Sequence, residues 1–530
     1  MFDYRIKCLK TAFSLCGRTT FFLSLFIFLS GCSVGPRYVK PEISVNQTWS
    51  VPDTTPLLVT RSQPDSAWWT IFGDPVLDSL VRLASQQNLT LQIAGLKITE
   101  ARAQLAATVG KQYPQVQAAI GNVTAIGASK DISEALGINR NFLNYQVGFD
   151  VSWEADFWGK YRSEVKAQKS TLLGTEADFD NALVSLIAEV ARTYTSIRTY
   201  QVLISLARRH VQLQSDGLEI AKSRFKNGAS PELDVIQATT LLESTKASIP
   251  QLELSLIQSG NALSTLLGLP PETNQKLLQD SGCIPPAPSE VAIVLPAQLL
   301  QRRPDVLRAQ LLAEAQCSRI GIAKSELYPK ILLSGKIRTQ SSSDLGLPTS
   351  NLFTPGSFFY ALGPQLVWPI LNYGRFNNKI RAEDARFQQL LTEYENTVLK
   401  AINEVEDWLS GYLKSREAAV FAQNAACEAQ RSVSLSLDLY REGAVDYQRV
   451  LEAQRSLLQE ENTLAQANST IITNLISLYK ALGGGWELRS GISVVKDSTR
   501  VEMQHRTNWG NLISRPETPD NNDIYTPEHR

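Results

Sequence analysis

Apolar and polar side chains alternate without interruption over residues 145–154. One face of this stretch carries aromatic and branched side chains, namely Tyr145, Val147, Phe149, Val151 and Trp153. The residues between them are polar or small. An alternation with a period of two predicts a β-strand that has one apolar and one polar side. The following stretch, 159–226, contains no proline, and at 1.5 Å per residue it can form one helix of roughly 100 Å.

The same pattern occurs a second time in the other half of the chain. Residues 145–165 match 360–380, so that the leading tyrosines and the tryptophans of the two strands coincide. Without a gap, the register also aligns pairs of residues far outside this stretch: Tyr113-Pro114 with Tyr328-Pro329, Glu189-Val190 with Glu404-Val405, Gly228-Ala229 with Gly443-Ala444 and Leu267-Gly268 with Leu482-Gly483. Agreement at so many separated points indicates a tandem duplication.

Each half is predicted to hold a helix, two strands, a very long helix and a closing helix. In the first half we expect them at residues 76–111, 115–128, 145–154, 159–226 and 232–268. In the second half we expect them at 303–328, 330–340, 358–370, 374–442 and from about 446 to 483. Pro250 predicts a kink or a division of the helix in which it lies. Residues 130–141 are expected to form a polar turn, and the polar tail after Val495 is expected to be irregular.

The charge balance gives no reason to expect a nucleic acid as a partner, since Lys and Arg together number 52 and so do Asp and Glu. No catalytic constellation and no phosphate-binding loop stands out, so we expect no enzyme. The histidines are isolated and predict neither a metal site nor a resident cofactor: His210, His505 and His529. Cys283, Cys317 and Cys427 lack metal-ligand spacing and are expected to be buried thiols, although their pairing stays open.

The first 31 residues have the features of a secretory signal. Basic residues precede a short apolar run, 21–29, which is too short to cross a bilayer as a helix. The run ends in Leu29-Ser30-Gly31-Cys32, which resembles a bacterial lipoprotein signal and implies cleavage before a Cys32 that carries diacylglycerol and an N-acyl chain. The alternative is an ordinary signal with an incidental cysteine. Each buried CH₂ of such a lipid would add roughly 0.8 kcal/mol of membrane affinity, and Ser33, in place of the aspartate that retains such proteins at the inner membrane, implies the outer membrane.

The predicted strands, four per chain and each about ten to twelve residues long, suit a bilayer crossing at a tilt. Lipid does not tolerate open sheet edges, because unpaired backbone groups cost several kcal/mol each. About eight strands are the practical minimum for a closed barrel, so copies of the chain must share one. Two copies would give a barrel filled by side chains, and three would give twelve strands around an open lumen. The side chains that suit the lumen face in the second half are Lys336, Arg338 and Gln340.

Several short motifs are distinctive: Cys32-Ser33-Val34-Gly35-Pro36-Arg37-Tyr38, Trp68-Trp69, Phe72-Gly73-Asp74-Pro75 and Arg302-Arg303-Pro304-Asp305. With them, the chain from residue 32 to about 488 resembles the TolC-like outer-membrane efflux channels, and more closely their lipidated NodT/OprM branch. The resemblance implies an α+β membrane protein, a homotrimer that shares a twelve-stranded transmembrane β-barrel continuous with a long periplasmic α-helical barrel. It further implies passive export of small molecules such as drugs and toxic compounds, with a periplasmic membrane-fusion adaptor and an inner-membrane pump as partners.

The resemblance also implies that two helical turns, 226–234 and 440–452, form a closed iris at the periplasmic end. Gly228 and Gly443 lie in these turns. The gating positions of the family correspond to Asp234, Tyr440, Arg449 and Glu452. Because Arg449 stands where TolC has an acidic residue, a pairing of Asp234 with Arg449 is a hypothesis. A solvated charge at a helix start is the alternative for each residue.

The expected organisation is a signal (1–31), a lipidated arm (32–66), two efflux repeats (67–284 and 285–488) and a polar tail (489–530). Trp68 and Trp69 are expected to be a buried anchor for the arm. Trp153 and Trp368 suit either an aromatic belt at the membrane interface or packing between helix and sheet. Two other functions stay open: an exit duct for type I protein secretion, and a periplasmic helical scaffold, against which the alternating strands argue.

Overall fold

The structure is a computed structural model that describes residues 33–43, 49, 58–60, 67–137, 139–271, 283–288, 290–293, 302–343, 352–491 and 493–513. The signal segment and Cys32 lie outside these described residues. The chain divides into two compact units, and each takes segments from both halves of the sequence. The sheet unit spans 1–41, 100–174 and 310–393, and the hairpin unit spans 42–99, 175–309 and 394–530.

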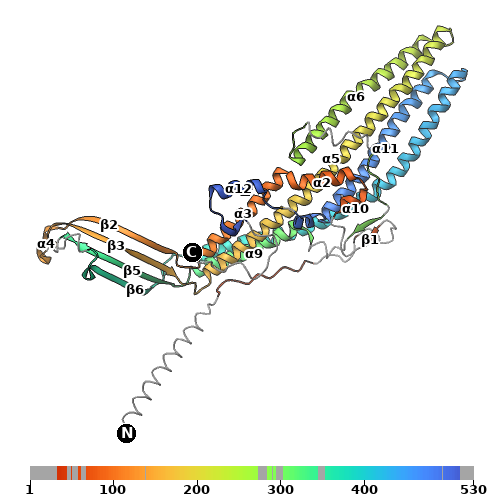
Figure 1. The fold of residues 1–530 in the computed structure, drawn as a ribbon. Helices are drawn as coiled ribbons and strands as arrows, with labels where there is room; N and C mark the ends of the chain where they lie inside the picture. Colours follow the sequence, from red (N-terminus) through yellow and green to blue (C-terminus); the bar gives the residue numbers. More distant parts are fainter. Residues whose placement is uncertain are drawn as a thin grey trace, which may run out of the picture. The chain divides into compact units, whose positions relative to one another are not determined.

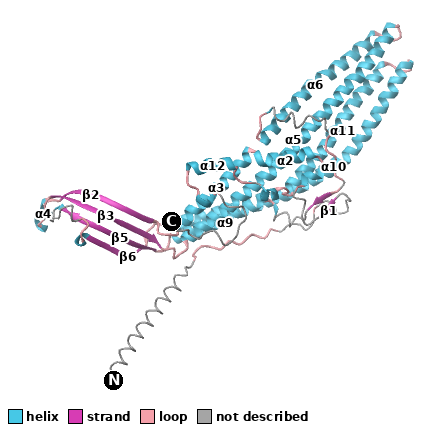
Figure 2. Cartoon of the chain, in the orientation of Figure 1, coloured by secondary structure: helices cyan, strands magenta, loops and turns pink. Residues whose placement is uncertain are grey.

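Among its described residues, the sheet unit forms an antiparallel sheet of four strands in the order β2-β3-β5-β6 (Figure 1, Figure 2). The strands are β2 (Val116–Gly127), β3 (Asn141–Glu154), β5 (Lys330–Ser342) and β6 (Phe358–Val367). They confirm the four strands predicted from the alternation. The register places Asp150 opposite Lys336 and Phe149 opposite Ile337, so polar residues share one face of the sheet and apolar residues share the other.

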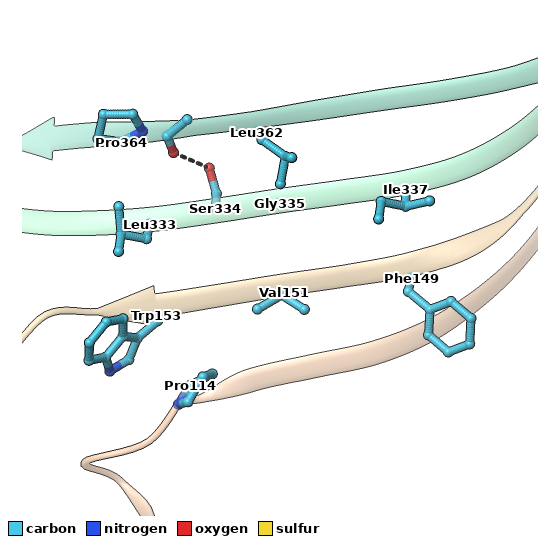
Figure 3. Close-up of a pocket in the computed structure, with 11 residues that line it drawn as sticks. Pro114, Phe149, Val151, Trp153, Leu333, Ser334, Gly335, Ile337, Leu362 and Pro364 are labelled. Atoms are coloured by element: carbon cyan, nitrogen blue, oxygen red, sulfur yellow. Dashed lines mark hydrogen bonds between the residues drawn. The ribbon is translucent and has the colours of Figure 1, made fainter. Parts of the chain in front are cut away.

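The two faces of this sheet differ in chemistry. On the polar face, Arg338 Nη2 lies 2.6 Å from Asp150 Oδ2, and Arg338 Nη1 donates to Gln146 Oε1 at 3.2 Å. On the other face, apolar side chains of β3, β5 and β6 lie together, among them Phe149 and Leu333 (Figure 3). The sequence pattern therefore placed Arg338 correctly on the polar face of the sheet, opposite the face that carries Leu333 and Ile337.

A short helix, α4 (Lys130–Leu136), lies between β2 and β3. Ser129 caps its start by accepting a hydrogen bond from the Ile132 N–H at 3.4 Å, and Gly137 ends it with a φ of 67°. Serine before a helix and a left-handed glycine after it are common helix boundaries. The prediction of a simple polar turn over 130–141 is wrong because it overlooked this pair of caps.

Two very long helices follow the strands in sequence: α5 (Lys160–Lys226) comes after β3, and α10 (Arg375–Glu442) comes after β6. Each leads into a shorter helix, α6 (Glu232–Leu267) or α11 (Tyr447–Ala481). In the hairpin unit these helices lie side by side as two hairpins (Figure 1). Pro250 lies inside α6, which continues through it without a division. Within the described residues, no helix combines the length and the apolar character needed to cross a membrane.

The region predicted as one helix over 76–111 forms two, α2 (Pro75–Gln87) and α3 (Leu89–Gly110). Asn88 separates them. Its Oδ1 accepts a hydrogen bond from the Leu91 N–H at 2.8 Å and so starts α3, while its Nδ2 donates to Leu266 O at 2.8 Å. The single-helix prediction is wrong because a tertiary contact with the end of α6 stabilises the break at the buried Asn88.

The second half repeats α3 as α9 (Pro304–Ser325), in the register of the tandem duplication. Two short strands, β1 (Leu58–Thr60) and β4 (Val291–Ile293), pair in parallel. The described residues also form short 3₁₀ helices, namely η1 (Trp68–Phe72), η5 (Pro355–Ser357), η6 (Trp486–Gly491) and η7 (Gly510–Leu512).

The tail after Val495 contains a helix, α12 (Asp497–Arg506), so the expectation of an irregular tail is wrong there. Val494 and Val495, which precede the helix, are buried. A Cβ atom on Gly95 of α3 would clash with the carbonyl oxygen of Val494. This close backbone approach fixes the start of the tail on α3, a contact that the local polarity of the tail does not predict.

Two of the distinctive motifs hold the N-terminal part of the hairpin unit. Trp68 is fully buried and stacks on Tyr479 with ring centroids 5.4 Å apart, and Trp69 beside it is also buried, as predicted. Asp74 accepts a hydrogen bond from the Val76 N–H at 2.9 Å and thereby caps α2. The same carboxylate accepts the Tyr194 hydroxyl at 2.5 Å. Burial, together with this hydrogen bond, raises the pKa of Tyr194 to about 12.

The Arg-Arg-Pro-Asp motif connects helix ends in the same unit. Arg303 Nη1 donates to Ala481 O at 2.8 Å and lies 2.8 Å from Glu404 Oε2. Arg303 Nη2 lies 2.8 Å from Asp305 Oδ2 at the start of α9. One guanidinium thus joins the C-terminus of α11, the side of α10 and the first turn of α9, which explains why this position holds an arginine with its five donors.

Candidate functional site

The two hairpins end in turns of the same backbone geometry. Gly228 and Gly443 occupy matched positions, with φ values of 72° and 76°. The residue after each glycine donates its N–H to a carbonyl oxygen in the last turn of the preceding helix, at 2.8 Å in the first hairpin and 2.9 Å in the second. This bond with a left-handed glycine is the Schellman pattern of helix ends. The structure places both glycines in the turns to which the sequence assigned them.

Tyr440 connects the two hairpins. It lies in the last turn of α10, is only 2% exposed, and donates its hydroxyl to Asp234 Oδ2 in the first turn of α6 at 3.2 Å. Its ring meets Tyr447 of α11 edge-on, with centroids 5.0 Å apart. Burial raises the pKa of Tyr440 and that of Tyr447, so both phenols stay neutral and Tyr440 stays a donor at physiological pH.

Arg224, in the last turn of α5, is a tip residue that the sequence analysis missed. Its Nη1 donates to the carbonyl oxygens of Tyr440 at 2.9 Å and Arg441 at 3.1 Å, at the end of α10. The guanidinium also lies over the ring of Tyr440, 4.9 Å from its centroid. Unpaired carbonyls at a helix C-terminus attract cations, so a basic residue in the last turn was a usable signal. The sequence does not say that this residue caps the neighbouring helix.

The remaining two predicted gate residues lie apart from this cluster. Arg449 Nη1 lies 3.8 Å from Glu452 Oε2 on the same helix, and their side chains are 73% and 70% exposed. Within one chain Asp234 does not pair with Arg449, because Asp234 is half-buried against Tyr440 while Arg449 is exposed; a pairing between chains of the channel stays a prediction. An ion pair as exposed as that of Arg449 and Glu452 contributes about 0–1 kcal/mol.

Apolar side chains from all four helices pack below the polar tip contacts. The buried members of this cluster are Leu218, Ala221, Ala238, Leu241, Leu242, Tyr440, Tyr447, Val450 and Leu451. Tyr440 and Tyr447 belong to both layers, since their rings pack in the cluster while the Tyr440 hydroxyl bonds to Asp234. The tip is therefore a packed apolar cluster, and a small number of polar bonds join its two hairpins.

A row of polar side chains lies between α5 and α11, further along the hairpins. His210 Nε2 lies 2.6 Å from Glu461 Oε2, and Arg209 Nη2 donates to Glu461 Oε1 at 2.5 Å. Burial opposes the ionisation of Glu461, yet these hydrogen bonds hold the pKa of its carboxyl below the usual value. Next to this row, the fully buried Gln454 lies against Gly217, where a Cβ atom would be 3.1 Å from Gln454 Nε2. His210, isolated in the sequence, is thus a hydrogen-bond partner of Glu461 between the hairpins.

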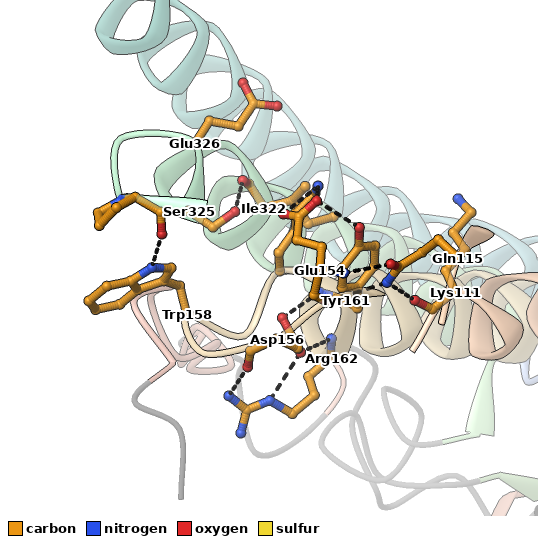
Figure 4. Close-up of polar contacts among 12 residues, drawn as sticks. Lys111, Gln115, Glu154, Asp156, Trp158, Tyr161, Arg162, Ile322, Ser325 and Glu326 are labelled. Atoms are coloured by element: carbon orange, nitrogen blue, oxygen red, sulfur yellow. Dashed lines mark hydrogen bonds and ion pairs between the residues drawn. The ribbon is translucent and has the colours of Figure 1, made fainter. Parts of the chain in front are cut away.

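In the sheet unit, carboxylates fix the passage from β3 to α5 (Figure 4). Asp156 accepts hydrogen bonds from the N–H groups of Tyr161 at 3.0 Å and Arg162 at 2.9 Å, in the first turn of α5. Glu154, at the end of β3, accepts hydrogen bonds from Lys160 Nζ at 3.1 Å and from the Tyr161 hydroxyl at 3.0 Å. Because helix N-termini attract negative charge, these two residues set the point at which strand changes to helix.

The strand tryptophans make the same contact in both halves. Trp153 Nε1 donates to Gln112 O at 3.1 Å, and Trp368 Nε1 donates to Leu327 O at 3.0 Å. Both acceptors lie in the turn between a helix and the following strand. The structure therefore gives each indole a helix-to-strand packing role, one of the two roles that the sequence left open.

Each junction also carries an ion pair at matched positions. In the first half Lys111 pairs with Glu164, and in the second half Glu326 pairs with Lys379 at 2.8 Å. The register of the duplication aligns Lys111 with Glu326 and Glu164 with Lys379, so the signs of the charges are exchanged. The two halves therefore keep an ion pair at the same place with the opposite order of charges.

The N-terminal arm lies beside the first junction. The Val34 N–H donates to Trp158 O at 3.4 Å. Gly35 meets Gly321 of α9 so closely that a Cβ atom on Gly35 would lie 2.8 Å from Gly321 Cα. A Cβ atom on Gly159 would likewise lie 3.3 Å from Ser33 Cα. The Cys-Ser-Val-Gly motif therefore contains the residues that let the arm lie directly on the backbone of the sheet unit.

The cysteines after residue 32 are free thiols. Cys317 is buried with its Sγ 3.7 Å from Pro36 O, and burial raises the pKa of its thiol. Cys283 and Cys427 are exposed. The prediction of three buried thiols is wrong for these two, and for Cys427 the reason is the helical period of α10, which buries Ala426 and Ala429 instead.

A family profile and known proteins match this chain over most of its length. The profile of the family described as outer membrane efflux protein matches residues 80–269 and 295–484. The two matched ranges are related by the same register that aligns Tyr145 with Tyr360, which confirms the tandem duplication.

The probable outer membrane lipoprotein SilC of Salmonella typhimurium is 30% identical over 469 residues, which cover 88% of this chain and 98% of that protein. The cation efflux system protein CusC of Escherichia coli is 29% identical over 459 residues, which cover 87% and 97%. Among solved structures, the outer-membrane channel OprN superposes with a TM-score of 0.79 at 28% identity, over 86% of this chain and 100% of that one. The fold is that of the TolC-like outer-membrane channels.

Proposed function

The chain belongs to the family of outer membrane efflux proteins, and on this premise we propose how it forms the exit duct of an efflux system. The duct lies in the outer membrane, extends into the periplasm and passively releases small molecules to the exterior. The relatives named above include a cation efflux component, which favours small solutes over secreted proteins as cargo.

The observation that carries the proposal is the two-faced sheet. Its end strands, β2 and β6, each pair with one neighbour among the described strands, so each chain offers two edges. Since unpaired edges cost several kcal/mol per group in lipid, three copies would join these edges into twelve strands around a lumen. Arg338 and Asp150 on the polar face would then meet the water in the lumen, and Phe149 on the apolar face would meet lipid.

The gate of this duct is assigned to the helical tips. Asp234, Tyr440 and Arg224 would hold the hairpins together through hydrogen bonds, each of which contributes about 1–2 kcal/mol. A partner that binds the separated hairpins more tightly than the joined ones would therefore open the duct. The exposed Arg449 and Glu452 at the start of α11 would be accessible to such a partner, which we take to be a periplasmic membrane-fusion adaptor together with an inner-membrane pump.

The mature chain would begin at Cys32, which carries diacylglycerol on its sulfur and an acyl chain on its amino group. Two observations support this: the lipoprotein-type signal in the sequence, and the position of the N-terminal arm. Ser33 and Val34 lie beside the junction where strand β3 changes to helix α5. Lipid attached there would enter the membrane next to the strands of its own chain. Stable anchoring requires more than one membrane signal, and the acyl chains and the sheet would supply both.

Native mass spectrometry and single-channel recording on the detergent-extracted, full-length protein test this proposal. We expect a mass of three lipidated chains and, in a planar bilayer, a channel that is mostly closed. Disruption of the gene in its own bacterium should raise the intracellular accumulation of toxic small molecules. A protein that is monomeric without detergent, or that forms no conducting channel, contradicts the proposal.

A further inference from the structure

The apolar face of the sheet contains a groove of about 560 Å³ between β3, β5 and β6 (Figure 3). Apolar side chains and glycines dominate its lining: Pro114, Phe149, Val151, Trp153, Leu333, Ser334, Gly335, Ile337, Leu362, Gly363 and Pro364. The groove lies on the flat face of the sheet and extends onto the end strand β6. When copies of the chain pair through the edges of β2 and β6, the new strands are added in the plane of the sheet, so its apolar face and the groove stay uncovered.

Glycine creates this groove. Gly335 lies between Val151 of β3 and Leu362 of β6 in the register, and a Cβ atom there would be 2.7 Å from Leu362 Cδ2. Leu362 thus leans over the missing side chain. At one end of the groove, the Trp153 indole is fixed by its hydrogen bond to Gln112 O. A fixed aromatic wall and a floor of backbone give the groove a defined shape.

The N-terminal arm begins close to the Trp153 end of the groove. Ser33 and Val34 contact Gly159 and Trp158, and Trp158 Nε1 donates to Pro329 O at 2.8 Å. Pro329 immediately precedes β5, and Leu333 in the groove follows four residues later, about 13 Å away at 3.3 Å per residue. One leaflet of the hydrocarbon core is about 15 Å thick. An acyl chain attached to the residue before Ser33 therefore reaches the groove.

We propose that one acyl chain of the lipid on Cys32 lies in this groove of its own chain. The inference rests on the proposed lipidation and on the outer-membrane duct. Because surrounding lipid is as apolar as the groove, the preference comes from close packing against a shaped surface and from the tether. A tether keeps the attached chain at high local concentration, so it competes well against free phospholipid. The anchor would then align the chain with the bilayer as well as hold it there.

Photo-crosslinking of the intact lipoprotein tests this proposal. Cells expressing the full-length chain are fed a fatty acid that carries a diazirine, and isolated outer membranes are irradiated. We expect mass spectrometry to find the Cys32 peptide joined through its acyl chain to peptides that contain Leu333–Ile337 or Leu362–Pro364. Trimer mass and channel conductance are measured on the same preparation.

Filling the groove supplies the matched comparison. Gly335→Leu and, at the rim, Ile337→Trp should each lower the yield of the crosslinked peptide at least fivefold. Gly121→Leu should leave the yield unchanged, because Gly121 pairs with Val147 on the same apolar face, outside the groove and with open space around it. The Ile337→Trp variant keeps the test valid if Gly335→Leu does not fold.

Three results overturn the inference. In the first, the acyl chain on Cys32 crosslinks only to phospholipid or to peptides from the helices. In the second, the yield of the crosslinked groove peptide is the same in both filling variants as in the unaltered protein. The groove can also crosslink equally well in a chain exported without Cys32, which would identify the occupant as a free phospholipid. An intact trimeric channel with any of these results rejects the groove alone. A mature chain that lacks lipid rejects the proposed lipidation itself.

Discussion

The two halves of the chain agree at one end and differ at the other. At the sheet, Trp153 and Trp368 donate to backbone oxygens at nearly the same distance, 3.1 Å and 3.0 Å. At the tips, the position that holds the buried Tyr440 in the second half holds Phe225 in the first, with 45% of its surface exposed. The buried Tyr447 likewise corresponds to the exposed Glu232.

At the tips, the two halves share the backbone conformation of the turn but differ in the side chains that they contribute to the contact. Both turns keep a left-handed glycine, so the backbone is the same. The first hairpin then contributes Arg224, which donates to the carbonyl oxygen of Tyr440, and Asp234, which accepts from the Tyr440 hydroxyl. The second hairpin contributes the buried rings of Tyr440 and Tyr447. The contact between the tips therefore joins unlike halves, whereas the tryptophan bond and the ion pair of each sheet junction have counterparts in the other half.

Removal of a buried ring should have the largest effect. In Tyr447→Ala, the local opening free energy of the α10–α11 tip should fall by about 3 kcal/mol, as expected when a large core side chain is truncated. The matched change Glu232→Ala should alter it by about 0.5 kcal/mol or less. Native-state hydrogen exchange of tip amides measures both values. Equal losses of opening free energy in the two variants would show that the two halves contribute equally to the tip.

Loss of the arginine between the hairpins should come next. Arg224→Ala removes two charge-assisted hydrogen bonds to the end of α10 and should destabilise the joined tips by about 2 kcal/mol. Arg449→Ala removes an exposed pair and should cost about 0.5 kcal/mol. Hydrogen exchange at residues 438–444 measures the loss of stability in each variant. A larger loss in Arg449→Ala would show that the contact holding the tips together lies at the start of α11.

The hydroxyl of Tyr440 should have a smaller effect on the gate. Tyr440→Phe keeps the ring but removes the hydrogen bond to Asp234, worth about 1 kcal/mol, so the open probability in single-channel recording should rise roughly fivefold. The matched change Phe225→Tyr adds a hydroxyl at an exposed position and should leave the open probability unchanged. A silent Tyr440→Phe would show that the Asp234 contact does not restrain the gate.

A junction ion pair should have the smallest effect. Lys111→Glu places two carboxylates together at a partly exposed site and should cost about 0.5–1 kcal/mol in thermal unfolding of the trimer. Adding Glu164→Lys recreates the charge order that the second half already has and should restore most of the loss. Failure of the double variant to recover would mean that the two junctions are not equivalent.

Much of the architecture could be predicted because it depends on sequence patterns within single segments. Alternation predicts the strands, the absence of proline predicts α5 and α10, and glycine predicts the helical turns. The misses depend on contacts between distant segments. Asn88 breaks a helix because it meets Leu266, and the tail is ordered because it meets Gly95.

The position of the tip could be predicted from the sequence, but the contacts between its side chains could not. The sequence placed Asp234 and Tyr440 at the tips but did not predict that they bond to each other within one chain, because helix phase across two hairpins decides which side chains face each other. Arg224 was missed for the same reason. At its matched position the second half has Leu439, so the duplication itself gave no indication of its role.

The contact between Gly35 and Gly321 has a consequence for how the protein is made. The two residues belong to opposite halves of the polypeptide, and the first of them leaves the export machinery long before the second. The arm cannot take its place until α9 has been delivered, so the N-terminal arm must wait while more than half of the polypeptide arrives. Contacts over such separations form late, and this one would close among the last steps of maturation.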